Sequence, residues 1–117
     1  MFVNEETVNN YKKQGVALLR NVISSDWLEK LAKGIEKNFL DPSKYKCVYE
    51  QENGKEIFYD DYCNWQRIEE YKDFIFNSDI AKIAAQLMQS KKVNLFHEHV
   101  LIKEPGAKKR TPWHQDQ

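Results

Sequence analysis

The sequence of 117 residues has few cysteines and histidines and no excess of charge of either sign. Cys47 and Cys63 do not form a Cys-x-x-Cys pair, so we expect both to be reduced and structural. Eighteen basic residues balance eighteen acidic ones, which removes the basic footprint typical of proteins that bind nucleic acids or anionic membranes. No apolar run approaches the roughly 20 residues of a membrane span, and residues 1–10 lack the pattern of a signal peptide. We therefore expect a cytoplasmic protein with neither a nucleic-acid nor a membrane partner.

The composition and length favour one folded domain at most. Apolar residues make up 41% of the chain and aromatic residues 13%, which is enough to form a hydrophobic core. Glycine and proline are scarce, with four and three residues, and we find no repeats, low-complexity tracts or linkers. Disorder and a two-domain organisation are therefore not expected.

The local pattern predicts an α+β chain. Capping residues and helical spacing of apolar residues indicate helices over residues 5–13, 24–39 and 79–89, with a further turn or two over residues 67–74. β-branched and alternating residues indicate a strand of five or six residues within residues 16–23, strands over residues 46–49, 56–59 and 93–103, and the start of another over residues 111–117. Asn53-Gly54 supplies the positive φ angles of a tight hairpin between the second and third of these strands. The basic cluster at residues 108–110 is expected to be a solvated loop.

His114 and Asp116 form the His-x-Asp pattern that points most directly to chemistry. On a strand, side chains two residues apart project to the same face, with backbones about 6 to 7 Å apart. Such a pair can supply two of the three ligands of a 2-His-1-carboxylate site for Fe(II). By itself the pattern is common, because a surface strand carrying histidine and aspartate has the same sequence.

The segment from Leu95 to Gln117, with its Lys103-Glu104-Pro105-Gly106 turn followed by Trp113-His114-Gln115-Asp116, resembles the phytanoyl-CoA dioxygenase family. Earlier helices and strands follow the order usual in that family. The resemblance implies N-terminal helices packed on the first strands of a double-stranded β-helix, also called a jelly roll. It also implies a dioxygenase that uses Fe(II), 2-oxoglutarate and dioxygen to hydroxylate a small molecule.

By that resemblance, His114 and Asp116 are the first two iron ligands. The carboxylate of Asp116 favours a hydroxylase, because related halogenases carry a small residue at this position. If the metal-facing side of the long strand is the one that carries Glu98, Val100 and Ile102, these three residues line the co-substrate pocket. A shift of one residue in strand phase would exchange them for His97, His99 and Leu101.

The sequence departs from the family pattern because a third ligand, a histidine, and an arginine for the distal carboxylate of 2-oxoglutarate are absent after Asp116. The three arginines are Arg20, Arg67 and Arg110, and all precede the pattern. A double-stranded β-helix of about eight strands also takes roughly 64 to 96 residues. We therefore expect residues 1–117 to be the N-terminal part of a single oxygenase domain, truncated after the His-x-Asp strand and inactive alone.

Two alternatives stay open. The chain could be a non-catalytic binding or structural module that keeps half a metal site. It could instead be a cupin-like metal-binding protein that uses a cluster of four residues, namely His97, His99, His114 and Asp116. The substrate and the oligomeric state are not encoded in any pattern that we recognise.

Overall fold

The computed structural model describes residues 2–49 and 57–115. These residues form four helices and three strands: α1 (Glu5–Gln14), α2 (Ser25–Leu40), β1 (Cys47–Tyr49), β2 (Phe58–Tyr62), α3 (Glu69–Asn77), α4 (Ile80–Met88) and β3 (His99–Lys103). The α+β class is confirmed. Because the described part of the chain contains one three-stranded sheet, the double-stranded β-helix stays a prediction. None of the described helices is long and apolar enough to cross a membrane.

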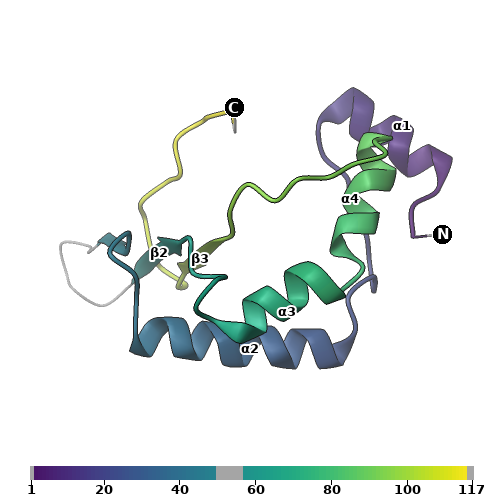
Figure 1. The fold of residues 1–117 in the computed structure, drawn as a ribbon. Helices are drawn as coiled ribbons and strands as arrows, with labels where there is room; N and C mark the ends of the chain where they lie inside the picture. The colour runs from purple at the N-terminus through teal and green to yellow at the C-terminus, as the bar shows by residue number, and fades with distance from the viewer. Residues whose placement is uncertain (1, 50–56, 116–117) are drawn as a thin grey trace.

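The elements are arranged as a sheet at one end and a pair of helices at the other. Helix α2 runs beneath the sheet, α3 packs along α2, and α4 rises from the end of α3 to meet α1 (Figure 1). Beyond β3 the chain continues on the side of the sheet away from α2 (Figure 1). The sheet therefore has one face covered by α2 and an opposite face on the side of the C-terminal segment (Figure 1).

The first two helices begin where their capping residues predict. The side chain of Asn4 accepts a hydrogen bond of 2.8 Å from the backbone N–H of Thr7, and Gly15 ends α1 with a left-handed φ of 74°. The hydroxyl of Ser24 accepts a bond of 3.4 Å from the backbone N–H of Trp27. Both helices are confirmed to within two residues.

The sheet has the order β1-β2-β3 and is antiparallel throughout. Val48 of β1 and Ile102 of β3 both lie opposite Tyr59 of the central strand. The predicted pairing of the second and third strands is confirmed by β1 and β2, whereas the turn at residues 52–55 lies outside the described residues. The strand predicted over residues 93–103 is present as β3, which forms the edge of the sheet opposite β1.

Three of the predicted strands are wrong in extent or type. Residues 16–20 are extended and alternate between exposed and half-buried, but they form no backbone hydrogen bond with another described residue and no strand. Residues 93–98 are also not strand, because the central strand ends at Tyr62, opposite His99. Likewise, residues 111–115 contain no strand. β-branched and aliphatic residues favour an extended backbone, but a β-strand also needs a neighbouring strand with which to form backbone hydrogen bonds.

The apolar core of the helical end contains Val3, Val8 and Ile83, with four half-buried residues packed around it: Leu19, Val22, Ile23 and Leu87. Residues 19–23 thus contribute side chains to this core although they are not a strand. Burial of this cluster joins α1 to α4 by the ordinary hydrophobic effect.

The sheet is joined to α2 by a buried polar network centred on Asp61. The side chains of Asp61 and Asn38 are completely buried, and the Asn38 amide donates a bond of 2.8 Å to the carboxylate. Ser43 donates from its backbone N–H, at 2.9 Å, and from its hydroxyl. Burial alone raises the pKa of Asp61, but hydrogen bonds from Ser43, Asn38 and the backbone N–H of Tyr62 outweigh it and lower the pKa to about 2. A satisfied buried carboxylate therefore fixes the central strand on the helix.

Candidate metal centre

His114 lies in the C-terminal segment, on the side of the sheet away from α2. Its Nδ1 atom is 2.8 Å from the carbonyl oxygen of Pro112. With Nδ1–H donating to that carbonyl, the neutral ring carries its lone pair on Nε2, which is the nitrogen that can bind a metal. Histidine ligands of metals are usually oriented in this way by a backbone carbonyl or a carboxylate.

A cavity of about 580 Å³ separates the C-terminal segment from the open face of the sheet. Two groups of residues line the cavity. The sheet contributes Tyr49, Phe58, Asp60, His99 and Leu101, and the C-terminal segment contributes Lys109, Arg110, Thr111, Pro112 and His114. The structure thus places His114 in a cavity that all three strands help to line. It is the natural candidate for a site that holds a small molecule beside a metal.

The side of the long strand that carries Glu98, Val100 and Ile102 does not face this cavity. Val100 and Ile102 lie opposite Asp61 and Tyr59, and side chains of opposed residues share a face of the sheet. That face meets α2, because the ring of Tyr59 packs on Phe39 with centroids 4.5 Å apart, tilted by 38°. The structure brings the alternative residues, His99 and Leu101, to the cavity instead.

Glu98 has a different set of contacts in the structure. Its carboxylate accepts hydrogen bonds from the backbone N–H groups of Asn64 and Trp65, the latter at 3.1 Å. Its own carbonyl accepts a bond of 3.2 Å from the N–H of Cys63, which has a left-handed φ of 62°. Glu98 therefore holds the turn that leads from β2 to α3.

His97 and His99 share a row of rings on the open face of the sheet. Tyr62 lies between them and Tyr45, with centroid distances of 4.7 Å to Tyr45, 5.6 Å to His97 and 5.4 Å to His99. His97 does not line the cavity. Within residues 2–49 and 57–115, no three histidine, cysteine or acidic side chains are grouped so that they could hold a metal. The cupin-like cluster, whose member Asp116 lies outside these residues, receives no support here.

The sequence pattern did not single out a polar cluster on the sheet side of the cavity. The Tyr49 hydroxyl donates to Oδ2 of Asp60 at 3.4 Å, and Oδ1 of Asp60 is 3.7 Å from Nε2 of His99. A hydrogen bond with the side chain of Cys47, followed by the negative charge of Asp60, raises the pKa of Tyr49 to about 12. Tyr49, Asp60 and His99 come from three different strands. Their side chains are brought together by the pairing of the strands, which the sequence does not reveal.

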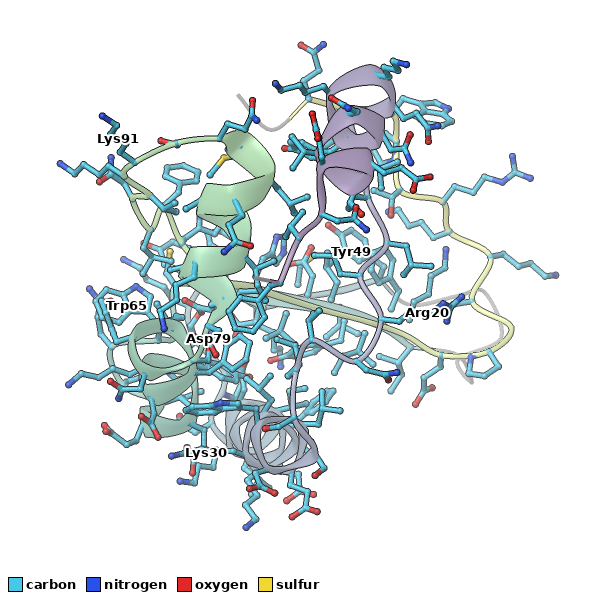
Figure 2. All side chains as sticks on the ribbon, turned by 90° about the vertical axis from the view of Figure 1, so that its right-hand side faces the viewer. Arg20, Lys30, Tyr49, Trp65, Asp79 and Lys91 are labelled. Atoms are coloured by element: carbon cyan, nitrogen blue, oxygen red, sulfur yellow. The ribbon has the colours of Figure 1, made fainter. Side chains whose placement is uncertain are left out.

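The basic loop also reaches the cavity, whereas the sequence indicated only a solvated loop. Lys109 and Arg110 both contribute to its wall. The Lys109 ammonium lies 4.2 Å from the ring centroid of Tyr49, which is labelled in Figure 2, and the Lys103 ammonium donates to the Lys109 carbonyl. Cation–π contacts of this kind stabilise a loop against an aromatic surface.

Arg20 and Arg67 do not line this cavity. Asp116 lies outside the described residues, so its geometry relative to His114 stays a prediction. Arg67 bonds to the side chains of Asn64, at 2.7 Å, and Asp41, at 2.9 Å. Cys47 and Cys63 are both free thiols, as expected.

Comparisons with known proteins identify a family. The family model described as phytanoyl-CoA dioxygenase matches residues 11–117. A search of curated proteins and a search of solved structures each gave no match. The matched range includes the whole cavity wall and the His-x-Asp pattern.

Proposed function

Because the chain belongs to the phytanoyl-CoA dioxygenase family, we propose that it is part of an Fe(II)- and 2-oxoglutarate-dependent dioxygenase that hydroxylates a small molecule. Family membership supports an oxygenase of this general type. The single observation that supports the site is the orientation of His114, whose Nδ1 faces the Pro112 carbonyl beside a cavity.

His114 and Asp116 would hold the iron, and their chemistry suits that ion. A neutral imidazole and an ionised carboxylate are two of the ligands of the facial triad, which leaves positions open for a co-substrate and dioxygen. When bound, Fe(II) with 2-oxoglutarate and dioxygen supplies the oxidising chemistry that converts a substrate C–H bond to C–OH. The protein contributes the position of the ligands and the shape of the cavity.

The cavity wall offers both an apolar surface and hydrogen-bonding groups to a substrate. Phe58 is buried and Leu101 is the apolar residue that β3 turns toward the cavity, so these two side chains give an apolar surface for the body of a substrate. The polar cluster of Tyr49, Asp60 and His99 offers hydrogen-bonding groups on the same wall. This arrangement can orient a small molecule beneath His114 and keep water from its apolar side.

The third ligand and the cation for 2-oxoglutarate are not supplied by His97 or Arg67 in this proposal. His97 does not line the cavity, and Arg67 is held by Asn64 and Asp41. His99 lines the cavity but faces Asp60, 3.7 Å away.

The experiment that tests this function measures succinate formed from 2-oxoglutarate by the full-length protein. The assay includes Fe(II) and dioxygen and is repeated across a panel of small metabolites. We expect succinate to form only when Fe(II) is present and to increase with the true substrate. Absence of Fe(II)-dependent succinate from a folded full-length protein would favour the non-catalytic module.

A further inference from the structure

The cavity wall carries more cationic than carboxylate side chains. Lys109 and Arg110 are the two permanently cationic lining residues, and Asp60 is the one carboxylate among the described residues of the wall. Asp60 already accepts a hydrogen bond from Tyr49 and faces His99. The lining therefore favours a ligand with negative charge.

Arg110 is the cation best placed to bind that ligand. Within residues 2–49 and 57–115 it forms no hydrogen bond, ion pair or ring contact. Its planar guanidinium can bind a carboxylate or a phosphate with two parallel hydrogen bonds. Lys109 differs, because its ammonium is placed over the ring of Tyr49.

Arg110 is also close to the proposed iron along the chain. His114 is four positions further along the chain, with three residues between, so the two Cα atoms are at most about 14 Å apart. A ligand bound at Arg110 by one end could therefore place its other end near the metal while its body contacts Phe58 and Leu101. A ligand that spans this distance has the size of a small metabolite.

We propose that the cavity binds a small organic substrate through a carboxylate or phosphate group held by Arg110. The proposal rests on the function proposed above and names the class of its substrate. The co-substrate 2-oxoglutarate carries the same kind of group, so the experiment must separate the two sources.

The test measures binding rather than turnover, so it does not depend on finding the natural substrate. The full-length protein is loaded with Co(II), which replaces Fe(II) without supporting the reaction. Hexanoate and phenyl phosphate serve as anionic probes, and hexanamide serves as the neutral counterpart of hexanoate. Saturation-transfer NMR gives the dissociation constants for the wild type, Arg110→Gln and Arg110→Lys.

We expect the anions to bind and hexanamide to bind at least tenfold more weakly. Arg110→Gln should weaken anion binding at least tenfold, and Arg110→Lys should restore part of the loss. Arg20→Gln is the matched control, since it removes the same charge from a residue that does not line the cavity. Equal binding of hexanoate by the wild type and Arg110→Gln would overturn the proposal, as would equal binding of hexanoate and hexanamide.

Saturating 2-oxoglutarate distinguishes the source of the anion. Retained binding of hexanoate supports a separate substrate position at Arg110. Complete competition would instead assign Arg110 to 2-oxoglutarate and overturn the proposal. A protein that binds the anions through Arg110 but forms no succinate would refute the proposed function alone.

Discussion

Asp61 and Asn38 form a hydrogen bond of 2.8 Å between two completely buried side chains. The bond joins the central strand to α2, so it fixes which face of the sheet is covered. The opposite face is thereby left to the cavity that contains His114. The placement of the candidate site thus depends on a polar contact on the other side of the sheet.

The first prediction concerns Asp61→Asn. The amide of the variant directs N–H groups toward donors on Ser43 and Asn38, so the free energy of unfolding at pH 7 should fall by about 2 to 3 kcal/mol. Chemical denaturation measures this change. Asp26→Asn, at an exposed position in the first turn of α2, is the control and should change stability by less than about 1 kcal/mol.

The pH dependence of stability gives a second measurement on the same carboxylate. Its pKa is lowered in the folded state from 3.8 to about 2, so its stabilising effect is complete above the unfolded pKa and is lost as the pH falls through the folded one. The wild type should lose about 2 kcal/mol between pH 4 and pH 2 relative to Asp61→Asn. Parallel stability curves for the two proteins over this range would contradict the low pKa.

The contact between α2 and α3 gives the next prediction. A Cβ atom added to Gly34 would lie 2.7 Å from a ring carbon of Tyr71 and 3.0 Å from Cβ of Glu70. Gly34→Ala should therefore destabilise the protein by about 1 to 3 kcal/mol despite the better helix propensity of alanine. Lys33→Ala, on the exposed side of the same helix, is the control and should not destabilise the protein. A Gly34→Ala protein as stable as the wild type would show that α2 and α3 can move apart at little cost in free energy.

Glu98→Gln tests the role of the residue that sequence interpretation assigned to the co-substrate pocket. Because its carboxylate holds the N–H groups of Asn64 and Trp65, the variant should lose about 1 to 3 kcal/mol of stability. The KM for 2-oxoglutarate in the full-length enzyme should stay within twofold of wild type. Glu29→Gln, on the exposed face of α2, serves as the control. A raised KM with unchanged stability would restore the pocket role of Glu98.

Adjacent residues of β3 allow a matched comparison of the two faces. Leu101 lines the cavity and is 54% exposed, whereas Val100 is half-buried on the α2 side. Leu101→Ala should weaken binding of hexanoate severalfold with little loss of stability, and Val100→Ala should lower stability by about 1 kcal/mol without affecting the ligand. Calorimetry and chemical denaturation measure the two effects, and the reverse result would mean that the strand has the opposite phase.

The sequence identified the features that depend on neighbouring residues. The caps at Asn4, Gly15 and Ser24 are local signals, and the structure shows all three. The α+β class and the family follow from patterns that lie along the chain. His114 was found because its spacing to Asp116 and its flanking residues form a continuous motif.

The features that the sequence missed depend on partners far along the chain. Residues 16–20 have strand composition but no strand partner among the described residues. The faces of the long strand each mix polar and apolar residues, so alternation alone could not select between Glu98 and His99. The meeting of Tyr49, Asp60 and His99 follows only from the register of three strands.

The most direct test of the account is a titration of the full-length protein and three variants with Co(II), followed by visible absorption. The account predicts one tight site in the wild type and in His97→Ala, and at least 100-fold weaker binding in His114→Ala and Asp116→Ala. Unchanged binding by His114→Ala, or loss of binding in His97→Ala alone, would contradict the assignment of His114 and Asp116 as the ligands of the iron.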